Sequence, residues 1–543
     1  MANAEVTIIL CGGAINYSTL PLGYSHANAM IPVNGKPVIG WILDDLLHKG
    51  IRQATVVLRA NDTRFADFLR RVYAPRMDLS LALLHHEGSI LESLQSGLLQ
   101  TPSAGLVRII LGDTLIRDSF EHPADMVYID EVDEARRWCV AFTDAAGVIT
   151  ELIDKPELPS GQYQALAGYY HLHHGDHLRD CLTQSLAQGE RELSRVLMRY
   201  HHAYPIHCRR VEDWYDFGNI DHLVEARRRL LSPRYFNALS INPVLNTITK
   251  VSAHDQKLQD ELDWFLKLPE ALKVLTPRIV SHHEIAHKLH IVQEYYGYPT
   301  LAELYVYADL DPEIWVSILR HVLRIHLELR HYQGVPQPEA AAQIYGAKTW
   351  ERLDALRALS PYWEALLELP TLTYNGRSLR NLPTLRPALD ASIRQLAAQT
   401  PWSIIHGDYC FSNILFDVNN QIVRLIDPRG SFGEKGIYGD PRYDIAKLRH
   451  SAVSLYDYIV ADMFDLNETN DPGGFVGQVY ANGVAHAVAA VFDRIIAAQG
   501  YDPDAIKVIE GLLFLSMTPL HRDRFQRQKM MYLTGISLLN EVL

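Results

Sequence analysis

The chain of 543 residues lacks the features that mark membrane, secreted and nucleic-acid-binding proteins. No apolar run reaches the roughly 18 residues that a transmembrane helix needs. The opening residues, MANAEVTIIL, match neither a signal peptide nor a transit peptide. The chain has 51 basic and 64 acidic residues, for a net charge of −13. This excess of negative charge disfavours nonspecific binding to nucleic acid. We therefore expect a cytoplasmic protein with no membrane span and no nucleic-acid partner.

Cysteine is scarce as well. The five cysteines are scattered, odd in number and without a CxxC pair, which is typical of free thiols in a reducing compartment. They are Cys11, Cys139, Cys181, Cys208 and Cys410. The remaining composition is that of a globular protein, with 48% hydrophobic and 21% charged residues, and the length predicts two to four domains of about 100–200 residues each.

The first 230 residues alternate strand-like and helix-like segments, which predicts an α/β domain with a parallel sheet covered by helices on both faces. A hairpin over 138–155, a strand over 165–172 and a helix from DFGNID to RRRLL follow. The earlier strands are expected at 6–10, 54–60, 79–86 and 106–113, and the helices at 37–49, 63–72 and 89–99.

A break at SPR (232–234) separates this part from a second one with a different pattern. Short strands around one helix at 255–268 occupy 234–300, and helical periodicity dominates 311–400 and the residues after 475. We place one domain boundary near 230 and a softer one near 298.

The stretch WSIIHGDYCFSNILFD (402–417) places an aspartate and an asparagine in one loop between two strands. Fourteen residues after Asn413, in the run VRLIDPRG, Asp427 ends a further strand, so a hairpin would bring these two side chains together. Their oxygens suit Mg²⁺, which bridges substrate phosphates. Asp408 would remain free to accept a proton from an attacking hydroxyl, as phosphoryl transfer requires.

A lysine on a strand would supply the cation that binds the ATP phosphates, and a glutamate on the next helix would hold that lysine in place. Lys250 lies in TITK and Glu261 lies eleven residues later on the next helix, which is the pairing that protein kinases use. Upstream, RYFNAL is expected to be the turn that covers the nucleotide, although it lacks the glycines of a protein-kinase loop.

HGDYCFSN, LIDPRG and the later GDPRYDIAKLRHS (439–451) resemble the aminoglycoside phosphotransferase and choline kinase superfamily, particularly its members in capsular polysaccharide clusters. The resemblance covers 233–543 and implies a bilobal protein-kinase-like fold with an N-lobe over 233–298 and a C-lobe over 299–543. By this resemblance Asp408 is the catalytic base, Asn413 and Asp427 hold Mg²⁺, Lys250 and Glu261 hold ATP, His406 shapes the loop, and Gln293–Tyr295 is the adenine-binding hinge.

The N-terminal part places the pair Gly12–Gly13 directly after its first strand, where backbone N–H groups can approach phosphates. Asp113 ends the strand IILGD, and Asp216 lies in VEDWYDFGNID. Two aspartates at strand ends can share one Mg²⁺ at the carboxyl edge of the sheet.

These segments, together with MIPVNGKPVI, EGSILESL and DKP, resemble the sugar-phosphate nucleotidyltransferases over residues 1–230 and imply their Rossmann-like fold. The resemblance gives roles to further residues. Gly12 and Gly13 would line the nucleotide, Gly88 and Ser89 would lie near its base, Asp113 and Asp216 would hold Mg²⁺, and Lys155 with Gly168 would contact the sugar phosphate.

The loop after the first strand departs from that family. The family carries two cations there, which face the triphosphate and the departing pyrophosphate, whereas this chain has Asn16–Tyr17 and Ala27–Asn28. Each lost cation should cost about 3–4 kcal/mol of transition-state stabilisation. Lys36 would compensate only in part. The sequence therefore leaves open an active nucleotidyltransferase or a domain that binds a nucleotide or sugar phosphate without turnover.

One motif points elsewhere. His283, Glu284 and His287 in SHHEIAHKLH spell the HExxH pattern of zinc proteases. That pattern binds zinc on a helix, but here a strand is expected, on which residues four apart lie about 13 Å apart. We expect exposed histidines on a polar strand.

The two halves predict one bifunctional enzyme for surface polysaccharide synthesis. The second half would use ATP and Mg²⁺ to phosphorylate a hydroxyl of a small sugar, polyol or amino alcohol, and the first would activate the phosphate with CTP, UTP or GTP. The alternatives are a kinase with a degenerate N-terminal binding domain, and a non-enzymatic scaffold of a capsule machine. Homo-oligomerisation is left open.

Overall fold

The computed structural model describes residues 5–13, 27–86, 88–102, 105–218, 220–230, 237–252 and 255–543. The chain forms two compact units, the first ending at Arg229 and the second beginning at Leu230. All five cysteines are free thiols, as expected. No helix among the described residues is long and apolar enough to span a bilayer.

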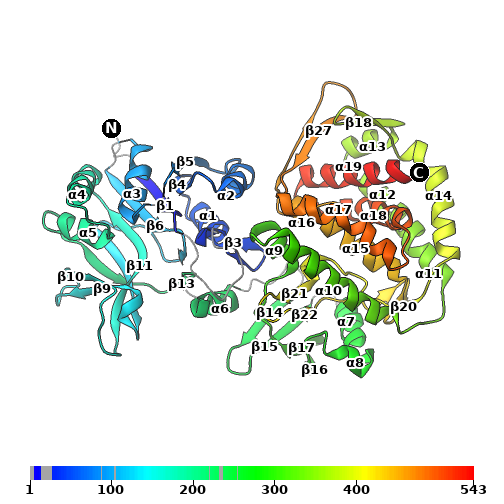
Figure 1. Ribbon diagram of the computed structural model, residues 1–543, viewed down its shortest axis with the longest axis horizontal. Helices are drawn as coiled ribbons and strands as arrows, with labels where there is room; N and C mark the ends of the chain where they lie inside the picture. The colour runs from blue at the N-terminus through cyan, green and yellow to red at the C-terminus, as the bar shows by residue number, and fades with distance from the viewer. Residues whose placement is uncertain are drawn as a thin grey trace. The chain divides into compact units, whose positions relative to one another are not determined.

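The first unit contains a nine-stranded sheet whose main path runs β10-β9-β11-β6-β1-β4-β5 (Figure 1). Strands β5, β4, β1 and β6 pair in parallel, as the alternating pattern predicts. However, β11 (Tyr163–Leu172) pairs antiparallel with β6 (Leu106–Leu111). The parallel arrangement expected from the alternating segments is therefore confirmed for these four strands, and the strand expected at 165–172 joins them antiparallel. Beyond β6 the strands β9 and β10 return as a hairpin, and hairpin partners are antiparallel.

Helices cover both faces of this sheet. Ile109 on β6 belongs to a buried cluster with residues of α3 (Ile90–Leu99), α4 (Gly175–Ala187) and α5 (Leu193–His201). Its neighbour Ile110 faces the opposite side, toward α1 (Val38–His48). Successive strand residues point to opposite faces, so the predicted two-sided covering is confirmed.

The predicted elements of this unit match the observed ones within a few residues. The remaining strands and helices are β1 (Glu5–Leu10), β2 (Pro32–Val33), β3 (Lys36–Pro37), β4 (Gln53–Arg59), α2 (Thr63–Phe68), β5 (Asp78–Leu84), β7 (Thr114–Ile116), β8 (Met126–Val132), β9 (Cys139–Thr143), β10 (Ile149–Asp154), β12 (His207–Arg210), β13 (Trp214–Asp216) and α6 (Ile220–Arg229).

The second unit opens with a four-stranded antiparallel sheet in the order β14-β15-β17-β16, against which α7 (Asp255–Lys267) packs. The strands are β14 (Asn237–Asn242), β15 (Thr247–Ser252), β16 (Ile279–Ile285) and β17 (Lys288–Glu294). From Asn237 on, RYFNAL belongs to β14, so the expectation that it forms a covering turn was wrong there. Its first three residues lie outside the described ones. The turn that joins β14 to β15 spans 243–246.

The rest of the second unit is mainly helical (Figure 1). Its helices are α8 (Glu270–Lys273), α9 (Leu301–Tyr307), α10 (Pro312–Arg330), α11 (Pro338–Ala342), α12 (Lys348–Arg357), α13 (Pro361–Glu368), α14 (Leu382–Ala398), α15 (Pro441–Ala452), α16 (Tyr456–Val460), α17 (Gly483–Ala498), α18 (Pro503–Met517) and α19 (Phe525–Val542). Six shorter strands are β20 (Ser403–Ile404), β21 (Ile414–Asp417), β22 (Ile422–Leu425), β23 (Ser431–Phe432), β24 (Glu434–Lys435) and β25 (Tyr438–Gly439).

A second four-stranded sheet lies within this helical part, in the order β19-β18-β27-β26. Its strands are β18 (Thr371–Tyr374), β19 (Arg377–Arg380), β26 (Phe464–Glu468) and β27 (Gly474–Val479). The predicted helical run over 311–400 misses its first hairpin, because strands of four residues are too short for a period-2 pattern to stand out. Only tertiary pairing of β18 with β27 completes the sheet.

The HExxH stretch lies on β16 and the turn after it. His283 and Glu284 are on the strand, whereas Ala286 and His287 form the turn with positive φ. All are exposed. This geometry excludes the helical zinc-protease arrangement, as predicted.

Candidate active sites

The hairpin of β21 and β22 joins the two proposed metal ligands of the second unit. Ile414 pairs with Leu425, and the Ile426 N–H donates to the Asn413 carbonyl at 3.0 Å. Asp427 therefore follows directly beside Asn413. Its φ of +56° is unusual for a non-glycine residue and turns the chain sharply at this carboxylate.

Asp408 is held by two side chains. The Asn413 amide donates to its Oδ2 at 3.0 Å, and the Lys447 ammonium lies 2.8 Å from its Oδ1. Burial opposes the charged form, but Lys447 outweighs it, so the pKa of Asp408 lies well below its usual range. Asp408 is thus an oriented, ionised carboxylate at neutral pH.

One face of α15 supports the whole loop. Asp444 accepts the N–H groups of His406 (2.7 Å) and Gly407 (2.8 Å), Lys447 reaches Asp408, and Ser451 Oγ accepts the N–H of Phe411 (3.2 Å). Asp444, Lys447 and Ser451 are spaced i, i+3 and i+7, so they share one side of the helix. The run that contains these residues carried part of the family resemblance, but no role was predicted for them. Their helical spacing was the signal that could have indicated one.

His406 is buried beneath the loop, where burial lowers its pKa to about 4. It is therefore neutral at pH 7. Its ring lies 5.6 Å from that of Trp264, edge to face, and Trp264 donates to the Ile405 carbonyl at 2.7 Å. These contacts support the structural role that the resemblance gives it.

Lys250 bridges Glu261 and Asp427. Its Nζ lies 2.7 Å from Glu261 Oε1 and 2.5 Å from Asp427 Oδ1, and both Lys250 and Glu261 are buried. Burial raises the pKa of Glu261 to about 7, even though Lys250 opposes this. A buried lysine between two carboxylates is a fixed cation beside the proposed metal ligands.

The donor set around Asp427 fits Mg²⁺. Asn413 donates to Asp408 through Nδ2, which leaves its Oδ1 as the ligand beside the Asp427 carboxylate. The described residues contain no group of three or more His, Cys, Asp or Glu that could hold a metal by themselves. One carboxylate and one amide match a cation that takes its other ligands from water and nucleotide phosphates.

The proposed adenine hinge lies at the end of β17. Tyr295 is buried and donates its N–H to the Asn246 carbonyl at 2.9 Å, while Gln293 Oε1 is buried and has no hydrogen-bond partner among the residues that the structure describes. The facing turn at 243–246 exposes Val244 and Leu245 and is fixed by Asn242 Oδ1, which accepts both of their N–H groups.

In the first unit, the glycine pair lines a cavity of about 430 Å³. Gly12, Gly13, Gly88 and Asp113 all lie on its wall, as the resemblance implies. An added Cβ at Gly12 would lie 2.8 Å from Leu84 Cδ1, so a side chain would intrude here. Ser89 lies beside Gly88 and caps α3: its Oγ accepts the Glu92 N–H and Glu92 accepts the Ser89 N–H.

The two N-terminal aspartates approach each other between β7 and β13. Thr114 pairs with Asp216, and the Phe217 N–H donates to the Asp113 carbonyl at 2.9 Å. A Cβ built on Gly218 would lie 3.1 Å from Asp113 Oδ2 and 3.2 Å from Asp216 Oδ1. Burial and then repulsion from Asp216 raise the pKa of Asp113 to about 6. Paired carboxylates of this kind favour a divalent cation.

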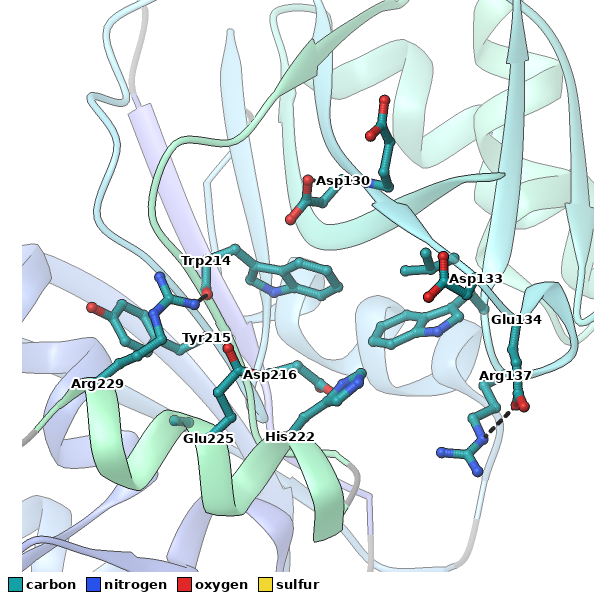
Figure 2. A pocket seen from close by; sticks show the side chains of 14 residues that line it. Asp130, Asp133, Glu134, Arg137, Trp214, Tyr215, Asp216, His222, Glu225 and Arg229 are labelled. Carbon is teal, nitrogen blue, oxygen red and sulfur yellow. Dashed lines mark hydrogen bonds and ion pairs between the residues drawn. The ribbon is translucent and has the colours of Figure 1, made fainter. Parts of the chain in front are cut away.

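A second cavity of about 350 Å³ opens on the Asp216 side. Figure 2 shows Trp214, Asp216 and His222 on its wall, and Trp138 packs edge to face on Trp214 with centroids 5.1 Å apart. The His222 Nδ1 lies 2.7 Å from Asp216 Oδ2. Sequence reasoning missed Trp138, which comes from the start of the 138–155 hairpin. The aspartate pair thus lies between two cavities, each large enough for part of a substrate.

Lys155 and Gly168 lie near these cavities but line neither. Lys155 is exposed, has a φ of +48°, and its N–H donates to the Trp138 carbonyl at 2.8 Å. Gly168 has a φ of +83°, and its Cβ would lie 3.0 Å from Thr114.

Of the two cations that the family is expected to carry in the loop after β1, this chain has none at the matching positions, but another residue supplies one. Asn16 and Tyr17 lie outside the described residues, but Asn28 donates to Asp113 at 3.2 Å instead of offering a charge. Lys36 pairs with Asp44 rather than with the cavity. Arg59, which sequence reasoning did not consider, lines the cavity at the end of β4 and pairs with Asp62 at 3.0 Å. One cation is therefore present.

Comparison with known proteins assigns a domain to each unit. The family model described as Nucleotidyl transferase matches residues 6–232, and the one described as Phosphotransferase enzyme family matches residues 246–464. Both are enzyme families, and both generally use nucleoside triphosphates and Mg²⁺. The two predicted resemblances are confirmed at this level.

The N-terminal half is also similar to curated proteins. It is 28% identical over 228 residues to UTP–glucose-1-phosphate uridylyltransferase AglF of Haloferax volcanii, covering 39% of this chain and 90% of that protein. It is 26% identical to a glucose-1-phosphate thymidylyltransferase of Mycolicibacterium smegmatis, covering 40% and 80%. A solved structure of a putative glucose-1-phosphate thymidylyltransferase from Bacillus anthracis matches with 21% identity and a TM-score of 0.37, covering 43% of this chain and 97% of that one.

Proposed function

We propose that this chain, which joins a nucleotidyl transferase domain to a phosphotransferase domain, phosphorylates a hydroxyl of a small molecule with ATP and then activates the phosphate to a nucleoside diphosphate derivative. The observation that carries the proposal is the convergence of Asp408, Asn413, Asp427, Lys250 and Glu261 in one site. They come from a loop, a hairpin, a strand and a helix, and their hydrogen bonds and ion pairs link them.

In the phosphotransferase step, the acceptor hydroxyl oxygen attacks the γ-phosphorus of ATP. The bond from that phosphorus to the ADP oxygen breaks, ADP leaves, and Asp408 takes the hydroxyl proton. The low pKa of Asp408 makes it a weak base, so its main role is to orient the hydroxyl and receive the proton late in the reaction. Lys250 binds the nucleotide phosphates, and Asn413 with Asp427 would hold Mg²⁺, which neutralises phosphate charge.

In the nucleotidyl transfer step, a phosphate oxygen of the product attacks the α-phosphorus of a second nucleoside triphosphate and pyrophosphate leaves. The cavity at Gly12, Gly13 and Gly88 suits the nucleotide, and the cavity at Trp138 and Trp214 suits the phosphorylated product, whose ring could stack on an indole. Asp113 and Asp216 would hold Mg²⁺ between them.

The named relatives support a particular version of this chemistry. They transfer uridylyl or thymidylyl groups to glucose 1-phosphate. We therefore favour UTP or another pyrimidine nucleotide over GTP, and a sugar phosphorylated at its anomeric hydroxyl over a polyol or amino alcohol. Because nucleotide sugars are donors for glycan assembly, we place the activity in the cytoplasm and its product in surface polysaccharide synthesis.

A second candidate is a kinase whose N-terminal domain binds a nucleotide or sugar phosphate without turnover. Asn28 favours it, because this side chain contacts Asp113 where the family is expected to carry a cation. Arg59 in the cavity opposes it.

The test uses the full chain with Mg²⁺, ATP and a panel of sugars, polyols and amino alcohols. ADP formation is measured first, and pyrophosphate release is then recorded with each added nucleoside triphosphate. Pyrophosphate that appears only with the phosphorylated product supports the two-step enzyme. ADP without pyrophosphate under every nucleotide favours the second candidate. The absence of ADP with every acceptor contradicts both.

A further inference from the structure

Basic side chains surround the proposed base Asp408. Lys447 pairs with it directly at 2.8 Å. Arg429 follows Asp427 and donates from Nη1 to the Tyr443 hydroxyl at 2.8 Å, while its backbone N–H donates to the His406 carbonyl at 2.9 Å. The loop that holds the base is thus covered by two cations, one from α15 and one from the segment after β22.

Two further cations approach from α12. Lys348 opens the helix and Arg352 lies one turn later on the same side. Among the described residues, neither side chain makes a hydrogen bond or an ion pair. Both are only half exposed. Lys348 is therefore a partly buried ammonium group without a carboxylate partner.

The position of Lys348 is fixed by the residues just before it. The chain from Gln343 to Ala347 is a π-helical turn, a distortion that is frequent at functional sites. Within it, Tyr345 donates to Asp440 at 2.8 Å and lies 6.4 Å, between ring centroids, from Tyr443, which is the partner of Arg429. These contacts bring the start of α12 beside α15 and Arg429.

The electrostatics agree with this placement. Burial, followed by repulsion from Arg429, Lys447 and Arg352, lowers the pKa of Lys348 to about 7. Asp408 favours the charged form of Lys348, but this carboxylate already pairs with the Lys447 ammonium at 2.8 Å. Asp444, also nearby, is engaged by two backbone N–H groups. The surroundings of the base therefore carry an excess of positive charge.

A partly buried cation without a partner is costly unless an anion completes it. We propose that the phosphotransferase site takes an anionic acceptor, a hydroxyl compound that also carries a carboxylate or phosphate group, and that Lys348 and Arg352, together with Arg429, bind that group. This inference rests on the proposed function and narrows its acceptor. It disfavours choline and other cationic amino alcohols, which these cations would repel.

The nucleotide has a separate cation. Lys250 on β15 pairs with Glu261 at 2.7 Å and Asp427 at 2.5 Å, whereas Lys348 opens α12 directly after the turn whose Tyr345 contacts Asp440. The two lysines therefore come from different elements, and Lys250 is the one paired with a proposed metal ligand. The anion bound by Lys348 belongs to the acceptor rather than to ATP.

The experiment compares related acceptors with and without an anionic group. ADP formation by the full chain is measured at pH 6.5, below the Lys348 pKa of about 7. The acceptors are glycerol against glycerate, glucose against glucuronate and glucose 6-phosphate, and ethanolamine as the cation. Binding of inorganic phosphate to the protein saturated with MgADP is measured by calorimetry in parallel. The variants are Lys348→Met and Arg352→Met. Lys507→Met, which removes a lysine of α18 that pairs with Glu541 of α19, is the control.

We expect the acidic member of a pair to be preferred and phosphate to bind the wild type. Lys348→Met should raise the KM of the acidic acceptor and the Kd of phosphate about 10- to 100-fold and leave the KM of ATP unchanged. Lys507→Met should change none of these three constants.

ADP formation without charge preference, or a rise in the KM of ATP alone, would overturn the inference but not the proposed kinase activity. Phosphate binding that depends on Lys348, without ADP from any acceptor, would keep the anion site and remove the proposed kinase. Phosphate binding that is absent or insensitive to both variants would overturn it.

Discussion

Lys447 and Asp408 form an ion pair of 2.8 Å. Lys447 lies on α15, 39 residues after Asp408, so a distant helix holds the proposed base in its loop. The pair keeps Asp408 ionised and oriented. It also means that the base is not an isolated loop residue, since its charge is set by α15.

Asp408→Asn should lower the kcat of phosphoryl transfer by about 10²- to 10⁴-fold, because the hydroxyl loses its proton acceptor while the side chain keeps its size. ATP binding should stay within about threefold, since Lys250 and Asp427 are unchanged. Steady-state ADP formation and calorimetry with ATP measure the two effects. Asp417→Asn, at the end of β21, is the matched control. Loss of ATP binding with transfer preserved would contradict the role given to Asp408.

Glu261→Gln should raise the KM of ATP about tenfold, because Lys250 loses one of its two carboxylate anchors. The free energy of unfolding should change by less than about 1 kcal/mol. The lost ion pair is offset because a neutral glutamine costs less to bury than a carboxylate. ADP assays and thermal unfolding give the two quantities. Asp263→Asn, exposed on the same helix, should change neither. An unaltered KM would show that Glu261 only packs the lobe.

Asp113→Asn should reduce nucleotidyl transfer below about 1% of wild type and leave ADP formation intact, because Asp113 and Asp216 lie in the first unit and the kinase residues in the second. Pyrophosphate and ADP release from one preparation report both. Asp144→Asn, in the turn between β9 and β10, serves as the control. A parallel fall of the two activities would mean that the units are coupled.

Gly430→Ala should destabilise the second unit by more than about 2 kcal/mol and weaken ATP binding. Gly430 has a φ of +66°, and its Cβ would lie 1.9 Å from the backbone carbonyl oxygen of Asp260, next to Glu261. Gly376→Ala has a similar φ of +76° with nothing within 4 Å, so it isolates the backbone strain. Thermal unfolding of both variants measures how much the clash with Asp260 adds to the backbone strain. Equal destabilisation of the two variants would contradict the prediction, because it would show that the clash is relieved at little cost.

The sequence predicts the motif-bearing elements well because local signals determine them. Asn413 and Asp427 flank a hairpin short enough for their spacing to imply contact, and Lys250 lies on a strand directly before the helix of Glu261. Lys447 and Lys348 were missed for the opposite reason. Nothing local ties α12 or α15 to residue 408, and only the packing of distant helices places them there. Arg59 and Trp138 in the first unit were missed likewise.

The support of the catalytic loop by Asp444, Lys447 and Ser451 has a consequence for how this chain can vary. The three contacts depend on a common helical phase, and one inserted or deleted residue would rotate the following part of α15 by about 100°. The backbone of the loop and the charge of its aspartate would lose their supports in a single event. All residues of α15 except Arg442 are buried, so a rotated helix would also have to repack on every side. The length of the run from Asp444 to Ser451 should therefore be fixed by the loop that it supports.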